Sequence, residues 1–315
     1  PLHRTLSAAG AFWLAAFTYF IWGFTFLASR IAQDYGTPFV LLFWRFALAF
    51  VLLNLLRLTG RFPVRLRGRR LWPVLLAGLF EPVLYFPCEQ YGLKLTSTSF
   101  SGVMVALIPL CSLVYGAAFL HEKATWQQVV FSVLSVAGVI VLAVYATGIG
   151  AGSFLGFLIL LGTVFAGAGY IVVCRACSGS FTAFERTYIT CGMGAAAFGV
   201  LSVLEHRHDL SAVVLPMTHA PFALAIVFLS VVASVLSYLA LNRALEVLPV
   251  ARTAALINFS TVVSVLAGVL LLHEPFGWVS AVASAAILVG IWGVQRFAAP
   301  TVPDTAESTE PLPPS

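Results

Sequence analysis

The stretch that decides the fold occurs twice, as Leu120-His-Glu-Lys-Ala-Thr-Trp126 and as Leu272-His-Glu-Pro-Phe-Gly-Trp278. The two copies stand 152 residues apart, and at this offset an ungapped alignment of Gly92–Val144 with Ala244–Arg296 gives ten identities. The chain has only 6 His and 7 Trp, so a shared Leu-His-Glu followed by Trp is more than a match between two apolar stretches. Self-similarity at a fixed offset predicts an internal structural repeat.

The composition places most of the chain in lipid. Of 315 residues, 60% are hydrophobic and 9% are charged, whereas a soluble domain usually carries about 25% charged residues. The net charge of +5 does not indicate a nucleic-acid-binding protein, because the basic residues lie in loops between apolar runs and form no recognition element. These numbers exclude an ordinary soluble domain and indicate a lipid bilayer as the main solvent.

Ten apolar segments have about the length that a membrane-crossing helix needs. They are Phe12–Ser29, Phe39–Leu56, Trp72–Leu93, Phe100–Leu120, Trp126–Ala146, Phe154–Cys174, Phe184–Leu204, Pro221–Leu241, Ala251–Leu272 and Trp278–Phe297. Backbone groups in lipid must be hydrogen-bonded within the segment, which favours helices. We therefore predict an all-α polytopic membrane protein with ten transmembrane helices.

The repeat divides these helices into a first five-helix repeat over residues 1–149 and a second over 150–297. Because five is odd, the second repeat must enter the membrane in the opposite sense to the first. Inverted repeats are typical of alternating-access transporters, with the substrate site near the midplane between the repeats. Residues 298–315 are rich in proline and acidic residues, and we expect them to be a disordered cytoplasmic tail.

The distribution of Lys and Arg predicts the orientation. In a ten-span arrangement thirteen of them fall on the side of both termini and three, Arg30, Lys94 and Arg207, fall on the other. The thirteen are Arg4, Arg57, Arg61, Arg65, Arg67, Arg69, Arg70, Lys123, Arg175, Arg186, Arg243, Arg252 and Arg296. Cytoplasmic loops carry the excess of basic residues, so both termini are predicted to be cytoplasmic.

Several of these motifs together resemble those of a known transporter family. Gly92-Leu-Lys-Leu-Thr-Ser-Thr-Ser99 with Pro109, and Ala244-Leu-Glu-Val-Leu-Pro-Val-Ala-Arg252 with the second Leu-His-Glu, resemble the two repeats of the drug/metabolite transporter superfamily, EamA type. The resemblance covers nearly all of residues 10–297 and is nearest to bacterial amino-acid exporters. It implies a central cavity and export of amino acids or related compounds. The second copy has Ser260-Thr261 where the first has Pro109, so a helix break is expected in the fourth span but not in the ninth.

The third span carries the most informative polar residues. Glu81, Tyr85 and Glu89 are spaced by four and form one stripe on a helix. Pro82 and Pro87 in the same span each remove a hydrogen-bond donor, and irregular backbone at membrane depth is tolerated where it lines a cavity. One interpretation is that this span lines the substrate path, with Tyr85 and Glu89 facing it. The other is that Glu81 pairs with a neighbouring helix and Glu89 lies near the surface.

Other deep polar and aromatic residues extend the set of candidate substrate-binding positions. Trp22, Tyr170 and Tyr238 lie deep in their spans, where an aromatic face could bind an ammonium group or simply pack. Asn258 needs a polar partner and is a candidate for contacting substrate. Arg45 either binds a carboxylate or phosphate or extends to the outer surface along its aliphatic stem.

The sequence predicts neither an enzyme nor a cofactor-binding protein. It has no G-x-x-x-x-G-K-[ST] loop and no G-x-S-x-G motif, and the Leu-His-Glu copies do not continue as H-E-x-x-H. Cys174-x-x-Cys177 alone is weak evidence for a metal or redox site and is equally typical of small residues in a membrane helix. Transport must then be driven by a gradient. Proton coupling through Glu81 or Glu89 and facilitated diffusion both fit the sequence.

The leading functional interpretation is a secondary transporter, an exporter or exchanger of amino acids and related small metabolites in the bacterial inner membrane, acting as a monomer or homodimer. A transporter of phosphorylated sugars or nucleotide sugars is the alternative with the same fold. That cargo calls for Lys or Arg at the midplane, and the sequence places no basic residue at the centre of a span. An intramembrane enzyme is less favoured because no Asp and no His lies deep in a span.

The inverted arrangement makes a direct topological prediction. Single cysteines introduced into residues 57–71 and into residues 205–220 should be labelled from opposite sides of the membrane by an impermeant maleimide. Labelling of both segments from one side would contradict two oppositely inserted five-helix halves.

Overall fold

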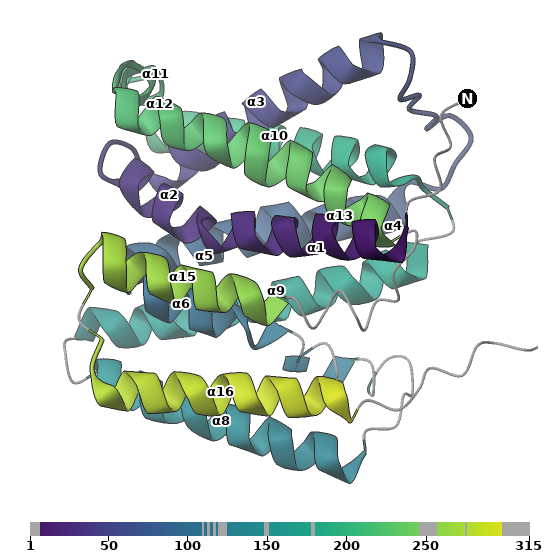
Figure 1. The fold of residues 1–315 in the computed structure, drawn as a ribbon. Helices are drawn as coiled ribbons and strands as arrows, with labels where there is room; N and C mark the ends of the chain where they lie inside the picture. The colour runs from purple at the N-terminus through teal and green to yellow at the C-terminus, as the bar shows by residue number, and fades with distance from the viewer. Residues whose placement is uncertain are drawn as a thin grey trace, which may run out of the picture.

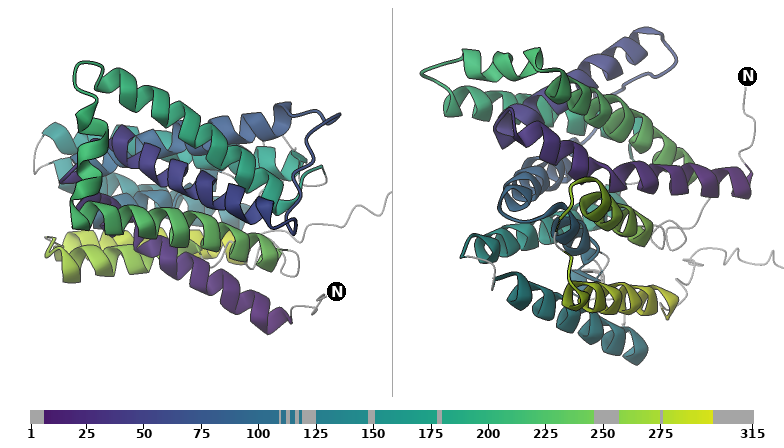
Figure 2. Two further views of the ribbon diagram at one scale, coloured as in Figure 1. Left: turned by 90° about the horizontal axis from the view of Figure 1, so that it is seen from above. Right: turned by 60° about the vertical axis from the view of Figure 1, so that its left-hand side comes forward.

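The computed structural model describes residues 7–108, 110–111, 114–115, 118, 125–147, 151–177, 180–245, 257–274 and 276–297. Within these residues every regular element is a helix. Figures 1 and 2 show the helices running roughly side by side, with the start of α1 and the loop after α3 at one end and the turn between α2 and α3 at the opposite end. The predicted tail, residues 298–315, lies outside the described residues.

The first repeat consists of five rods, three of them broken. They are α1 (Ala8–Gly23) with α2 (Thr25–Gln33); α3 (Pro38–Leu58); α4 (Trp72–Gly78), η1 (Leu79–Leu84) and α5 (Tyr85–Leu95); α6 (Thr98–Val105) with the helical residues beyond it; and α8 (Trp126–Thr147). After Val105 the chain makes a turn at residues 106–107 before helix resumes at 108. The fourth rod therefore has the expected break, while Pro109 itself lies outside the described residues.

The second repeat has the same five rods. They are α9 (Ala151–Cys177); α10 (Ala183–Glu205); α12 (Ala220–Val227), η3 (Phe228–Leu236) and α13 (Ser237–Leu245); α15 (Ile257–Leu271); and α16 (Trp278–Arg296). The connection from α10 to α12 holds the short helices α11 (Ser211–Val214) and η2 (Leu215–Thr218). As expected, α15 is continuous through Ser260 and Thr261.

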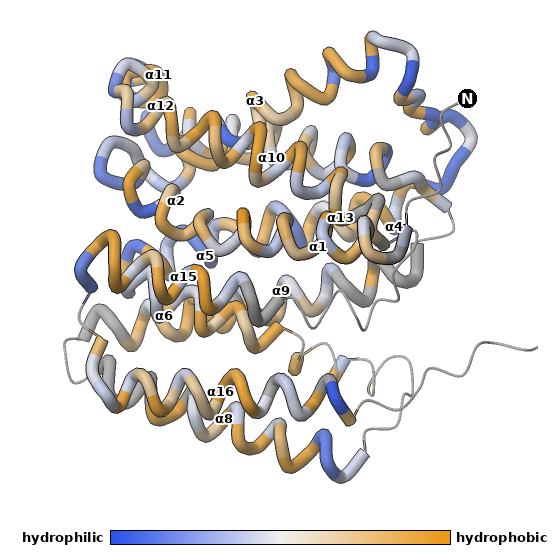
Figure 3. The backbone as a smooth tube through the Cα atoms, in the orientation of Figure 1, coloured by the Kyte–Doolittle hydropathy of each residue, from blue (hydrophilic) through white to orange (hydrophobic). Residues whose placement is uncertain are grey.

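The apolar character of the rods matches a membrane protein. Among the described residues, Ala9–Gln33, Pro38–Leu58, Phe184–Glu205 and Ala220–Leu241 are each long and apolar enough to span a bilayer, and three shorter apolar helices accompany them. Figure 3 shows apolar residues along the helices and hydrophilic residues gathered at the turns. The ends carry ordinary caps: Thr182 and Glu185 form a capping box on α10, and Ser97 accepts a hydrogen bond from the backbone of Phe100 on α6.

The helix contacts show the inverted two-fold relation between the repeats. Three rods pack against their own counterparts: α3 on α10, α6 on α15, and α8 on α16. The other two exchange partners, since α1 packs on α13 while its counterpart α9 packs on α4 and α5. The loop after α3 lies at one end of the molecule, and its counterpart in the second repeat, the loop around α11, lies at the opposite end (Figures 1 and 2). The two repeats therefore run in opposite senses.

The contact between α8 and α16 depends on two glycines related by the repeat. A Cβ on Gly138 would lie 2.9 Å from the carbonyl oxygen of Ala283, and one on Gly290 would lie 2.6 Å from that of Phe131. Ser135 donates a hydrogen bond of 2.9 Å across this contact to the carbonyl of Ile287, its own counterpart 152 residues on. Small residues that let backbones approach are typical of membrane helix interfaces.

The second Leu-His-Glu copy lies at the end of the molecule that carries the α2–α3 turn (Figure 1). From the loop between α15 and α16, the Glu274 carboxylate accepts hydrogen bonds from the backbone nitrogens of Thr98 (2.6 Å) and Ser99 (2.9 Å) at the start of α6. The Ser99 hydroxyl adds a third bond of 2.8 Å. A carboxylate satisfies the free N–H groups of a helix N-terminus and complements its dipole. The motif that revealed the repeat therefore joins one repeat to the other.

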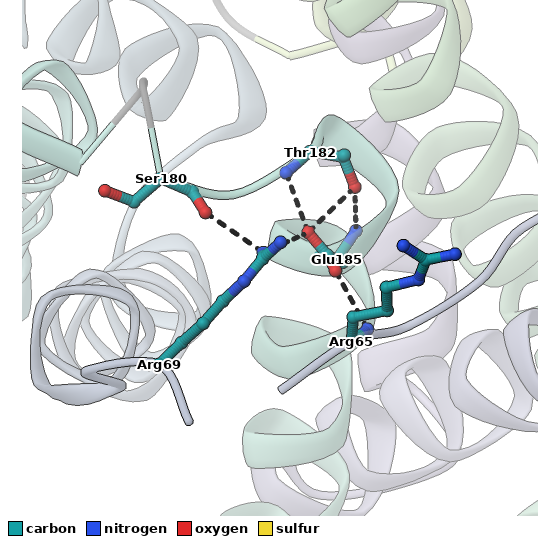
Figure 4. Close-up of polar contacts among 5 residues, drawn as sticks. All are labelled: Arg65, Arg69, Ser180, Thr182 and Glu185. Carbon is teal, nitrogen blue, oxygen red and sulfur yellow. Dashed lines mark hydrogen bonds and ion pairs between the residues drawn. The ribbon is translucent and has the colours of Figure 1, made fainter. Parts of the chain in front are cut away.

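The arginine-rich loop after α3 is anchored at the end of the molecule that carries the start of α1 (Figure 1). The Glu185 carboxylate accepts hydrogen bonds from the backbone nitrogen of Arg65 (2.9 Å) and from the Arg69 guanidinium (3.1 Å), which also bonds the Ser180 carbonyl (Figure 4). The ring of Phe62 stacks on Phe184 at a centroid distance of 4.9 Å. These contacts attach the loop of the first repeat to α10 of the second.

Gly290→Ala should destabilise the protein, because the new Cβ would clash with the backbone of α8. Overpacking of this kind typically costs about 1–3 kcal/mol, so the thermal midpoint in detergent should fall by several degrees. Val289→Leu, a lipid-facing change one residue away at a side chain that is 49% exposed, is the matched control. Equal midpoints for the two variants would refute the close approach of α8 and α16.

Candidate functional site

The third rod is broken at the position that the prolines predict. Glu81 has non-helical backbone angles (φ −138°, ψ 111°), the Glu81–Pro82 peptide bond is cis, and η1 is a π-helical segment between α4 and α5. Pro87 lies in the first turn of α5, which follows η1 directly, and the backbone N–H of Tyr85 at the start of α5 donates to the carbonyls of Phe80 and Pro82. The break is thus at Glu81 and Pro82, and Pro87 lies beyond it.

The eighth rod, which is the counterpart of the third, is irregular at the same place. Its π-helical segment η3 covers residues 228–236, and η1 shifted by 152 residues falls on 231–236. Such segments appear frequently at functional sites. Both repeats therefore depart from regular α-helix near the middle of the corresponding rod, where irregular backbone is tolerated if protein surrounds it.

A pocket lies beside η1, between the two repeats. It is lined by Phe46, Glu81, Pro82, Phe86, Tyr170, Thr187, Thr190, Cys191 and Tyr238, with about 260 Å³ of empty space that includes its opening. The first four come from α3, η1 and α5 of the first repeat, and the others from α9, α10 and α13 of the second. Residues from both repeats therefore face one space, as a midplane site between inverted repeats requires.

Three of the predicted residues form a continuous contact at this pocket. The Tyr238 hydroxyl donates a short hydrogen bond to the Glu81 carboxyl group. The Tyr238 ring lies 5.1 Å from that of Trp22 between centroids, and the Trp22 indole nitrogen donates a 3.0 Å hydrogen bond to the carbonyl of Ala233 on η3. Trp22 sits where the first rod is interrupted between α1 and α2, so broken segments of three rods meet here.

Arg45 is buried, and the interpretation that it extends to the outer surface is wrong. Its side chain is 3% exposed, its Nε donates a 3.1 Å hydrogen bond to the Ser234 hydroxyl, and its guanidinium lies 4.4 Å from the centroid of the Phe86 ring. Ser234 and Phe86 stand near the middle of their broken rods. The sequence-based expectation that no basic residue reaches the midplane is therefore corrected as well.

Tyr85 and Glu89 are buried behind the pocket wall and do not line it. Tyr85 points towards α9, where a Cβ on Gly167 would meet its ring at 3.3 Å. The Glu89 carboxylate accepts a 3.0 Å hydrogen bond from the Gln90 amide, which also donates to Ser29 on α2. Glu89 and Glu81 both interact electrostatically with Arg45. The predicted stripe on the third rod is therefore divided by the break, with only Glu81 in the pocket wall.

One predicted site residue, Asn258, has not yet been placed, and several polar residues near the pocket were not predicted. Asn258 lies on α15, but its side chain is outside the part of the chain that the structure describes. Sequence reasoning missed Thr187, Thr190 and Cys191, whose spacing of three and four residues puts them on one face of α10. It also missed Ser230, Ser234 and Ser237, buried hydroxyls that follow one another at intervals of four and three residues along η3 and α13. Polar residues at helical spacing within an apolar span were the signal available for both groups.

The pocket offers groups for reversible binding. It combines a carboxyl group, two phenols, two threonine hydroxyls and aromatic faces, which are groups that hydrogen-bond a polar ligand or attract a cation. Among the described residues no three His, Cys, Asp or Glu side chains gather as they would to hold a metal ion. These groups come from both repeats and face one space.

Comparisons with known proteins agree with this architecture. The chain is 31% identical over 285 residues to "Uncharacterized transporter YcxC" of Bacillus subtilis, covering 89% of this chain and 91% of that protein. It is 26% identical over 286 residues to an uncharacterized transporter of Archaeoglobus fulgidus, covering 89% and 97%. A protein of known crystal structure superposes with a TM-score of 0.64 at 19% identity, over 93% of this chain and 98% of that one.

The model of one family matches the chain twice, once in each repeat. The matches cover residues 9–144 and 154–296, and the family is described as the EamA-like transporter family. These two matches, together with the multi-helix inverted-repeat fold and the pocket between the repeats, lead to one conclusion: the chain belongs to the EamA-like transporter family of multi-pass membrane proteins.

Proposed function

We propose that this protein is a secondary transporter that exports or exchanges amino acids and related small metabolites by alternating access. The observation that carries the proposal is the pocket at the meeting of the two repeats, in which Glu81 and Tyr238 face aromatic side chains. A primary ammonium group can be held by a carboxylate and by the faces of aromatic rings. Residues that bind the cargo belong to both repeats, so a rocking motion between repeats exposes the same pocket to either side.

We further propose that the protein resides in the inner membrane of a bacterium, with both termini cytoplasmic, as a monomer or homodimer, and that it carries out no catalysis. The lipid bilayer and the small-molecule cargo are its partners, and nucleic acid is not. The thirteen-to-three distribution of basic residues supports this orientation. The arginine-rich loop after α3 then lies on the cytoplasmic face.

A phosphorylated cargo is less compatible with the site. Arg45 is the only buried Lys or Arg within the described part of the chain, and two buried or partly buried carboxyl groups lie around it. A phosphate ester carries up to two negative charges and would meet one guanidinium and two acids. An α-amino acid, with one charge of each sign, is matched better by the same groups.

Glu81→Gln should lower amino-acid efflux from proteoliposomes by about tenfold or more, because a hydrogen bond from a charged ammonium group is worth about 1.5–3 kcal/mol. The vesicles would be loaded with labelled amino acids, a sugar phosphate and a nucleotide sugar together. Tyr238→Phe, which keeps the ring and removes the hydroxyl, should give a smaller loss.

Leu224→Ala is the matched control, since this residue of α12 is 70% exposed towards lipid, and it should transport like the wild type. Efflux of the sugar phosphate or nucleotide sugar alone would overturn the proposed cargo. Full amino-acid efflux by Glu81→Gln would remove Glu81 from the binding site.

A further inference from the structure

The buried guanidinium of Arg45 has one hydrogen-bond partner, and the carboxyl groups of Glu81 and Glu89 act on it only electrostatically. Within the described part of the chain it is the only Lys, Arg or His in the buried class. It forms one side-chain hydrogen bond, through Nε, and no described carboxylate lies within the 4.0 Å of an ion pair. Its Nη1 is buried with no hydrogen-bond partner. A charged donor buried without a partner loses the hydration that it has in water.

A second donor without a partner lies on η3, the helix whose Ser234 accepts the hydrogen bond of Arg45. Ser230 is 0% exposed and its hydroxyl forms no hydrogen bond. It precedes Ser234, which accepts the hydrogen bond from Arg45 Nε, by four residues along η3. Residues four apart lie on nearly the same face of a helix. The serine that positions Arg45 and the serine without a partner therefore lie along one face of η3.

The rings around Arg45 connect it to the pocket. Its guanidinium carbon lies 4.4 Å from the centroid of Phe86 and 5.6 Å from that of Phe46. Both rings line the pocket that contains Glu81, whereas Arg45 itself is not in its wall. The two phenyl rings thus border both the guanidinium and the pocket.

We propose that Arg45, positioned by Ser234 and assisted by Ser230, forms a carboxylate-binding subsite, so that the cargo is a carboxylate-bearing amine held between Arg45 and Glu81. This inference rests on the proposed function and specifies its substrate class. A guanidinium presents a planar pair of donors that matches a carboxylate, and a serine hydroxyl supplies a further donor. The unpartnered Nη1 and the unpartnered hydroxyl are both satisfied when a carboxylate binds.

The test compares ligands that differ only in the carboxylate. Purified protein would be titrated with L-phenylalanine and with 2-phenylethylamine, and L-leucine and isopentylamine would form a second pair. Binding is followed by the rise of the thermal midpoint in detergent, which needs no transport. We expect the wild type to bind each amino acid at least about tenfold more tightly than its amine, as the loss of a charge-assisted hydrogen bond predicts.

Arg45→Gln should reduce amino-acid binding to the level of the amine and leave amine binding unchanged. A purely structural role for Arg45 would instead weaken both ligands of a pair equally and would overturn the proposal. Arg45→Lys should restore only part of the preference, since an ammonium group lacks the planar fork. Inorganic phosphate serves as a further probe. If phosphate stabilised the protein and the amino acids did not, the ligand of Arg45 would be a phosphate, and the proposed carboxylate subsite would be overturned.

Ser230→Ala keeps the proposal testable if Arg45→Gln does not fold. Removing a hydroxyl that has no partner leaves no buried group unsatisfied, so the variant should fold and should lose several-fold in amino-acid binding but not in amine binding. Leu236→Ala, on η3 with a side chain 52% exposed, should change neither. Equal affinity of every variant for both ligands of a pair would overturn the subsite.

Transport is measured separately, so the two proposals fail in different ways. Binding of amino acids through Arg45 without any efflux from proteoliposomes would refute the proposed function and leave the subsite standing. Efflux of amino acids and amines at equal rates, unchanged by Arg45→Gln, would refute the subsite and leave the transporter standing.

Discussion

The constraint on which this structure depends is that backbone N–H and C=O groups in hydrocarbon must find partners within the protein. It turns nearly every apolar run into a regular helix and leaves irregular backbone only where other helices surround it. The interruptions between α1 and α2, in η1 and in η3 occur near the middle of their rods. Around them lie Trp22, Glu81, Tyr238 and Arg45. The departures from helix and the polar groups that could bind a cargo therefore coincide.

The repeat adds a second constraint, because an odd number of helices forces the two halves to face each other in opposite senses. Three rods then meet their own counterparts, and the other two exchange partners. Polar contacts join the halves at both ends, in addition to those around the pocket: Glu274 caps α6 at one end, and Glu185 anchors the arginine-rich loop at the other. The pocket lies between these two sets of contacts and takes side chains from both halves.

Much of this arrangement could be predicted from the sequence because it follows from periodicity and length. The spans, the repeat, the inverted sense and the break beside Pro82 are local or additive properties of the chain. The site was harder to predict because it depends on which helices meet. Nothing near Arg45 in the sequence indicates that Ser234, 189 residues away, accepts its hydrogen bond. Similarly, the spacing of Glu81 and Glu89 predicts a shared face only on an unbroken helix, and the break at Glu81 separates them.

The pairing of Gly138 and Gly290 has a consequence for how such a chain can evolve. Gly138 in the first half lies against the backbone of Ala283 in the second, and Gly290 in the second half lies against the backbone of Phe131 in the first. After the duplication that an internal repeat implies, a side chain gained on one copy would collide with main-chain atoms of the other. Main-chain atoms cannot be removed by a compensating substitution. The two halves were therefore free to diverge along their lipid-facing and pocket-facing sides, but at this contact neither glycine could gain a side chain.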